Sequence, residues 1–117
     1  MTVIGNFRSM QTNDLTAELV GNIRTIGFSG KLAIVHDGGA SHPNAPSHRV
    51  FLINEDSVRL EVGAAWSQKI KQGVRAGEEF LSANIDDPSF ERPLSFALFQ
   101  SDEHTWEATW RRRQTTN

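Results

Sequence analysis

The sequence contains no cysteine. That absence excludes disulfides, thiolate zinc sites, cysteine nucleophiles and iron–sulfur clusters, so any chemistry must come from histidines, carboxylates or hydroxyls. Long hydrophobic runs are missing too, because no stretch approaches the roughly 18 apolar residues that a membrane span needs. Residues 1–8 also lack the basic and apolar segments of a targeting peptide. We therefore expect a soluble, cytoplasmic protein with no membrane partner.

The sequence also has no large excess of positive or of negative charge. The twelve Lys and Arg residues nearly balance the fourteen Asp and Glu residues, which leaves a net charge of -2. Such a balance does not by itself predict a polybasic nucleic-acid binder or a disordered acidic segment. With 117 residues, 38% of them hydrophobic, the chain fits one compact domain. We expect that domain to span residues 1–113, followed by a flexible end at residues 114–117.

Apolar and polar residues alternate along much of the chain, as in half-buried β-strands. In the clearest segment, residues 58–66, we expect Ala64 and Trp66 on the buried face and Gly63 and Ala65 on the other face. Further strand segments are residues 3–7, 15–23, 32–35, 50–53, 81–85, 94–99 and 106–110. Gly, Pro, Asn and Asp cluster between them, as in an antiparallel meander. The sequence therefore predicts an all-β fold, a small antiparallel barrel or sandwich of seven or eight strands.

Three histidines form a candidate metal-ligating set. His36, His42 and His48 are spaced by six residues, and Asp37 lies beside the first. Imidazoles and a carboxylate can ligate zinc, but this spacing fits no standard metal motif. We therefore interpret the segment as a polar loop and expect no metal.

Two carboxylate or hydroxyl arrangements are candidates for catalysis. A Ser-His-Asp set is formally available from Asp37, His42 and either of two serines, Ser41 and Ser47, but no Gly-Xaa-Ser-Xaa-Gly nucleophile elbow is present. The adjacent carboxylates of Asp86 and Asp87 precede Pro88, which favours a turn over a shared proton or a bound cation. We therefore expect neither an enzyme nor a cofactor.

Tryptophans offer either core packing or a stacking face. Gly63 shortly precedes Trp66, and we favour a core tryptophan at a bulge or barrel corner over a ligand-stacking ring. Trp106 and Trp110 are four residues apart and share one face of a strand. One of them is expected in the core.

Basic residues beside aromatic ones are a candidate nucleic-acid site, because single-strand binders combine phosphate contacts with base stacking. If the loop after Trp66 and the end of the last strand meet in space, six positive charges converge. The candidate residues are Lys69, Lys71, Arg75, Arg111, Arg112, Arg113, Trp66 and Trp110.

A series of short motifs runs along nearly the whole chain. They are Ile-Gly-Asn-Phe at residues 4–7, Asn-Ala-Pro at 44–46, Val-Gly-Ala-Ala-Trp at 62–66, Asp-Asp-Pro-Ser-Phe at 86–90 and Ala-Leu-Phe at 97–99. In order and spacing this series resembles the family called domain of unknown function 736, small proteobacterial proteins often encoded on plasmids and other mobile elements. The resemblance implies a mostly β domain with no assigned activity and no catalytic residues to carry over.

These observations lead to a non-enzymatic binding module of a mobile element as the expected function. A protein partner is favoured, for example a host defence protein, and single-stranded nucleic acid processed with a plasmid is the alternative. An acidic surface would mimic nucleic-acid charge toward a basic protein partner. Its candidate residues are Glu78, Glu79, Asp86, Asp87, Glu91, Asp102, Glu103 and Glu107. A homodimer paired through an edge strand is a further alternative, if the barrel does not close.

Overall fold

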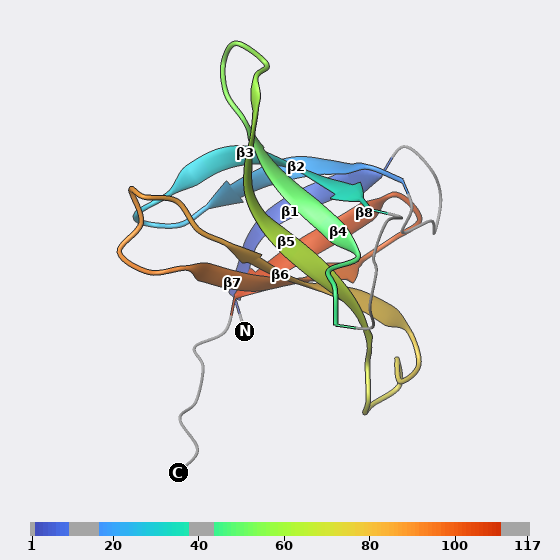
Figure 1. The fold of residues 1–117 in the computed structure, drawn as a ribbon. Coiled ribbons are helices and arrows are strands. Elements are labelled where there is room, and N and C mark those ends of the chain that lie inside the picture. The colour runs from blue at the N-terminus through green and yellow to red at the C-terminus, as the bar shows by residue number, and fades with distance from the viewer. Residues whose placement is uncertain (1, 10–16, 38–43, 111–117) are drawn as a thin grey trace.

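The computed structural model describes residues 2–9, 17–37 and 44–110. These form eight strands: β1 (Thr2–Ser9), β2 (Leu19–Arg24), β3 (Ser29–His36), β4 (His48–Ile53), β5 (Arg59–Lys69), β6 (Glu79–Ile85), β7 (Leu94–Gln100) and β8 (Thr105–Trp110). Each strand pairs antiparallel with the next, and β8 pairs with β1, so the sheet closes into a barrel (Figure 1). The all-β prediction is confirmed, with the barrel as the correct one of the two architectures.

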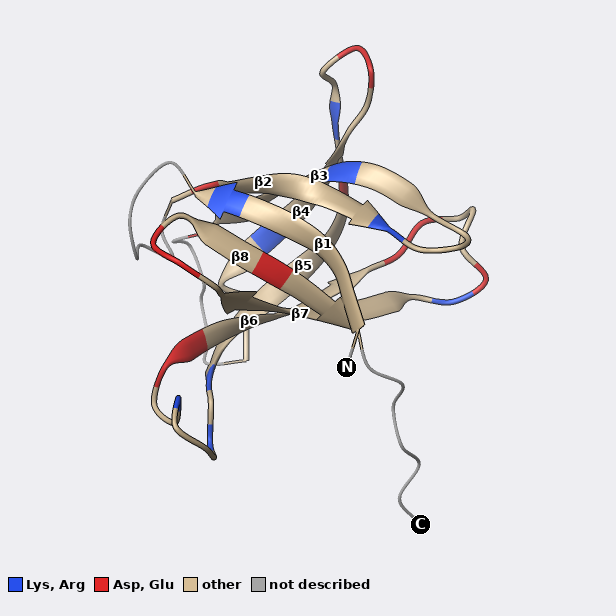
Figure 2. Ribbon diagram, turned by 180° about the vertical axis from the view of Figure 1, so that it is seen from behind, with Lys and Arg blue, Asp and Glu red and all other residues tan. Residues whose placement is uncertain are grey.

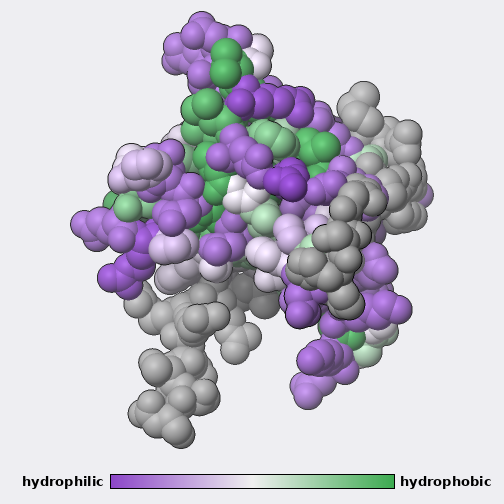
Figure 3. All heavy atoms as spheres, in the orientation of Figure 1, coloured by the Kyte–Doolittle hydropathy of each residue, from purple (hydrophilic) through white to green (hydrophobic). Residues whose placement is uncertain are grey.

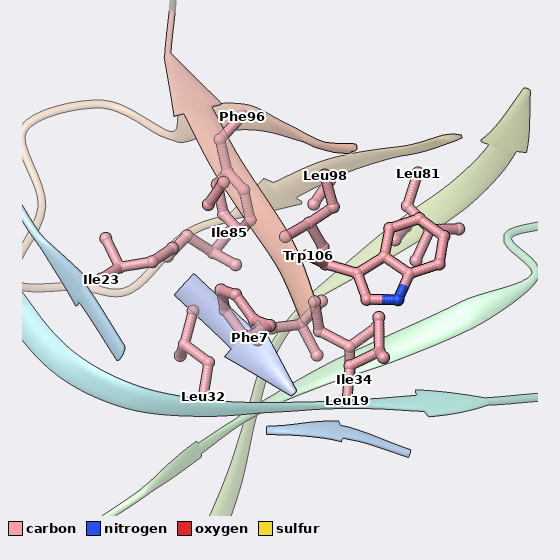
Figure 4. Packing of buried hydrophobic residues seen from close by; sticks show 14 residues of the cluster. Phe7, Leu19, Ile23, Leu32, Ile34, Leu81, Ile85, Phe96, Leu98 and Trp106 are labelled. Atoms are coloured by element: carbon pink, nitrogen blue, oxygen red, sulfur yellow. The ribbon is translucent and has the colours of Figure 1, made fainter. Parts of the chain in front are cut away.

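Side chains from all eight strands fill the interior. Phe7, Leu32 and Leu98 are fully buried, and Trp106 is 3% exposed. Figure 4 shows residues of opposed strands pointing into one shared core. A barrel of eight strands is just wide enough for such side chains to fill it. The centre of the molecule is therefore packed, and a ligand can be taken only at the surface or at a mouth.

Closure depends on glycines at two irregular places in the sheet. The register shifts between Val3 and Gly5 in β1, and a second shift places Val50 opposite Gly63 and Phe51 opposite Glu61. A Cβ on Gly63 would lie 2.0 Å from the carbonyl oxygen of Asn84, so any larger residue would collide with the backbone of β6. Bulges with glycine let strands bend sharply at barrel corners.

Because of the second bulge, residues 58–66 do not all lie on the faces of the sheet that their alternation predicted. Val62 is the extra residue of the bulge, and it still packs against the core. Beyond it the alternation moves by one position, because a bulge inserts one unpaired residue. Ala65 is therefore buried, and Trp66 lies partly buried on the outer face. The predicted corner is confirmed, whereas the placement of Trp66 in the core is wrong; Trp106 fills the core instead.

The two mouths of the barrel differ in the segments that surround them. Thr2 at the start of β1 pairs with Trp110 at the end of β8, so both strand ends lie at one opening, here called the terminal mouth. Figure 1 shows the β2–β3 and β6–β7 connections of this mouth side by side at the left, and the β4–β5 hairpin projecting at the top. The connections of the terminal mouth are residues 25–28, 54–58 and 86–93. The opposite mouth includes residues 70–78 and 101–104.

Within the described ranges, no helix is long and apolar enough to cross a membrane.

The glycine at the β5 bulge provides a test of closure. We expect Gly63→Ala to lower the free energy of unfolding by about 2–3 kcal/mol, because the new methyl group forces β5 and β6 apart. Gly27→Ala is the matched control, since a Cβ at Gly27 has no neighbour within 4 Å. Urea denaturation measures both. Equal stabilities of the two variants would contradict the role given to Gly63.

Candidate functional site

An apolar cavity of about 850 Å³ opens at the terminal mouth. Its walls come from the start of β1, the 25–28 turn, the 86–93 loop and the last residue of β8. The large apolar side chains that line it are Val3, Ile4, Ile26, Phe28, Phe90, Leu94 and Trp110. A concave, mainly apolar site with a few polar groups is the usual form of a ligand or docking site.

Two aromatic rings hold the wall of this cavity in place. Phe28 and Phe90 meet edge to face, with ring centroids 5.1 Å apart, and both pack against the buried core. The 25–28 turn is fixed by Thr25, whose backbone N–H donates to the carbonyl of Phe28 at 2.7 Å and whose hydroxyl accepts from the Phe28 N–H at 3.0 Å. These contacts fix the 25–28 turn against the 86–93 loop on one wall of the cavity.

Exposed apolar side chains gather at the same mouth. Among the described residues, five large hydrophobic side chains are strongly exposed, and four of them belong to the strand ends and turns of the terminal mouth: Val3, Ile26, Val58 and Leu60. The fifth, Val74, lies at the opposite mouth. Figure 3 shows apolar surface where the β4–β5 hairpin leaves the barrel. Val3 and Ile26 also line the cavity, and exposed apolar surface of this kind on a folded domain marks an interaction site.

The charged residues that line the cavity are both arginines. Arg24 and Arg92 contribute to its wall, and neither has an ion pair within the part of the chain that the structure describes. Other arginines are neutralised: Arg49 pairs with Asp37 and Glu61, Arg59 with Glu18, and Arg75 with Glu78. The cavity thus offers two guanidinium groups to a partner.

The predicted basic cluster is divided by the fold. Lys71 and Arg75 lie at the opposite mouth and Lys69 ends β5 there, whereas β8 ends with Trp110 at the terminal mouth. Arg75 is held within the protein, because it also donates to the carbonyl of Gln100 at 2.8 Å. The remaining basic candidates lie outside the described residues: Arg111, Arg112 and Arg113.

The outer face of β5–β7 carries aromatic residues that sequence reasoning missed. Phe80 and Phe99 stack with centroids 4.9 Å apart and an angle of 17° between the rings. They point outward because their neighbours Leu81 and Leu98 are buried. Trp66 lies on the same side of the sheet, and its indole N–H donates to the carbonyl of Asn44 at 3.1 Å. In both strands, buried and exposed positions alternate, and Phe80 and Phe99 are the neighbours of the buried Leu81 and Leu98. That alternation was the sequence signal for two outward-facing rings.

The predicted acidic surface is divided as well. Figure 2 shows acidic residues at both mouths of the barrel. The 86–93 loop carries Asp86, Asp87 and Glu91 at the terminal mouth. At the opposite mouth are Glu78, Asp102 and Glu103, while Glu79 begins β6 and Glu107 lies within β8. These carboxylates do not form one continuous surface.

Two of the acidic residues stabilise turns. Asp87 accepts hydrogen bonds from the hydroxyl and the N–H of Ser89, and these bonds hold the pKa of its carboxyl below the usual value. Bonds from the backbone of His104 and from Thr105 likewise lower the pKa of Asp102. The turn interpretation of Asp87 therefore agrees with the observed contacts.

Of the three histidines of the candidate metal site, the described structure brings two together. His36 and His48 meet edge to face at 5.2 Å, and the Ser47 hydroxyl lies 2.8 Å from Nδ1 of the buried His48. That hydroxyl also accepts from the N–H of Ser67, while Asp37 accepts from Arg49. His42 and Ser41 lie outside the described residues, and the described residues include no group of three His, Cys, Asp or Glu side chains placed to hold a metal.

The turn formed by Asp87 predicts a pH dependence. Because the pKa of Asp87 is lowered in the folded protein, its carboxylate stabilises the fold above the unfolded pKa, and that contribution disappears as the pH falls through the folded pKa. Asp87→Asn should lower the melting temperature at neutral pH, and its difference from the wild type should shrink in acid. Glu91→Gln, on the same loop, controls for the lost charge. A difference that does not change with pH would contradict this account.

Comparison with known proteins adds one match. The family described as a protein of unknown function, DUF736, matches residues 3–113. No curated protein and no solved structure matches the chain. Because the match covers nearly all of the sequence, the resemblance drawn from the short motifs is confirmed. The chain belongs to the DUF736 family of proteins of unknown function.

Proposed function

We propose that this protein is a non-catalytic, cytoplasmic binding module that docks a protein partner at the terminal mouth. The observation that carries the proposal is the gathering of exposed apolar side chains around an apolar cavity at one end of a closed barrel. Burying such surface is the main favourable term in protein association. A preformed cavity also reduces the ordering cost of binding.

The composition of the mouth supports a protein partner. Aromatic residues and arginine are enriched at the energetic centres of protein interfaces, and the cavity combines Phe28, Phe90 and Trp110 with Arg24 and Arg92. An apolar side chain of the partner would fill the cavity, and its acidic groups would pair with the two guanidinium groups.

The setting on a mobile element, with a host defence protein as partner, belongs to this proposal and is motivated by the family. Nucleic-acid mimicry would need one acidic surface, and the described carboxylates are divided between two mouths. We therefore place recognition on the apolar surface of the terminal mouth rather than on negative charge.

Two equally exposed apolar residues provide a matched test of the docking surface. Ile26 at the terminal mouth and Val74 at the opposite mouth are 109% and 104% exposed. A photo-crosslinking amino acid at position 26 should trap a partner in the bacterial host, and the same group at position 74 should not. Ile26→Asp should weaken binding of the trapped protein by about tenfold or more, whereas Val74→Asp should leave it unchanged. Mass spectrometry identifies the trapped chain. Equal trapping at both positions, or trapping at neither, would refute the proposed surface.

Single-stranded nucleic acid is the second candidate, and the outer face of β5–β7 is the observation that favours it. The stacked rings of Phe80 and Phe99 lie beside the end of β5, where Lys69 precedes the loop that holds Lys71. Bases stack on aromatic rings, and phosphates pair with lysines. Glu79 is the cross-strand neighbour of Lys69, so the local charge is mixed.

Fluorescence anisotropy with labelled single-stranded DNA and RNA tests this candidate. Binding should be saturable and should weaken as salt rises, and Lys71→Glu should weaken it while Lys31→Glu, on β3, should not. Phe99→Ala should weaken it by about tenfold, the effect of one lost base stack. If no binding occurs at low salt, nucleic acid is excluded as the ligand.

A further inference from the structure

The β4–β5 hairpin is a fixed projection beside the terminal mouth. Figure 1 shows its tip extending well beyond the barrel. Within the tip, the N–H of Asn54 donates to the carbonyl of Val58 at 3.1 Å, and the N–H of Ser57 donates to the carbonyl of Asn54 at 2.9 Å. The side-chain oxygen of Asn54 also accepts from the N–H groups of Asp56 and Val58. The hairpin therefore presents its side chains in a defined arrangement.

Two carboxylates and two apolar side chains are displayed on this projection. Glu55 and Asp56 are exposed at the tip, and neither has an ion pair within the described ranges. Val58 and Leu60 follow, 49% and 50% exposed. Exposed apolar residues beside unpaired carboxylates suit docking against a basic, apolar site, which buries the apolar surface and pairs the carboxylates.

The cavity of the terminal mouth has the complementary chemistry. Its walls are apolar, and the charged groups that line it are Arg24 and Arg92. The described structure contains no ion pair between these arginines and Glu55 or Asp56 of the same chain. The hairpin extends away from the barrel of its own chain, so the two complementary surfaces are available to another copy.

We propose that the terminal mouth is occupied by the β4–β5 hairpin of a second copy of this chain, in a two-fold symmetric dimer. The proposal rests on the proposed function, which makes this mouth a docking surface for protein. The hairpin and the cavity lie at the same end of the barrel. Two copies that are related by a two-fold axis can therefore face each other with these ends, so that each copy inserts its hairpin into the cavity of the other. In each direction, Glu55 and Asp56 pair with the arginines, and Val58 and Leu60 cover apolar surface.

This dimer differs from one formed by strand pairing. Because β1 pairs with β8, the eight described strands form a closed sheet and leave no open edge among them for another copy. The residues after Trp110 are poor occupants of the cavity, since Arg111, Arg112 and Arg113 repeat the charge of its wall. The acidic hairpin is the better match.

Reversal of charge on one surface at a time tests the proposal. The mass of the full chain in solution, measured by light scattering, should rise with concentration from 13.1 kDa toward twice that value. Arg24→Glu with Arg92→Glu should weaken self-association by at least about tenfold, and so should Glu55→Lys with Asp56→Lys. Mixing these two charge-reversed variants should restore a dimer that contains one copy of each. Lys69→Glu with Lys71→Glu, at the opposite mouth, is the control that should leave the dimer intact, and circular dichroism verifies that each variant is folded.

Three results would overturn the proposal: a wild-type chain that stays monomeric at every concentration, a dimer that survives both charge reversals, or a mixture that fails to pair. Each of them leaves the proposed function testable by itself. A different protein trapped at position 26 would then show that the mouth docks another chain and not a second copy, whereas trapping at neither position would refute the docking surface itself.

Discussion

Pairing between β1 and β8 closes the sheet and removes the strand edges through which β-proteins usually associate. Closure requires sharp bends, and the bulge at Gly63 supplies one of them because the backbone of β6 leaves no space for a Cβ there. The closed interior is filled by Phe7, Trp106 and their neighbours. Binding is thereby directed to the outer face and to the two mouths.

The two mouths have different chemistry, and the difference follows from the connections around them. At the opposite mouth, Arg75 pairs with Glu78 and donates to the carbonyl of Gln100, and Asp102 accepts from the backbone N–H of His104. At the terminal mouth, Phe28 and Phe90 form a fixed wall, while Ile26 is fully exposed and Arg24 has no ion pair among the described residues. Exposed apolar surface around a fixed wall is suited to association.

The strands were predictable from alternation, because a two-residue period is a local property of the chain. The outward position of Trp66 was not, since one bulged residue changes the face of every residue after it. The cavity was missed for another reason. Ile4, Phe28, Phe90 and Trp110 are far apart in sequence, and only the closed topology brings them to one mouth. An apolar residue within a turn, Ile26, was the one local signal of that surface.

The claim that the terminal mouth receives the β4–β5 hairpin of a second copy is tested most directly by the backbone amide NMR spectrum of the full chain, recorded at high and at low concentration. The account predicts that the resonances which shift on dilution come from residues 24–28, 55–60 and 90–94, while those of residues 70–78 and 101–104 stay in place. Shifts centred on the opposite mouth or on the outer face of β5–β7 would contradict it, and so would a spectrum that does not change with concentration.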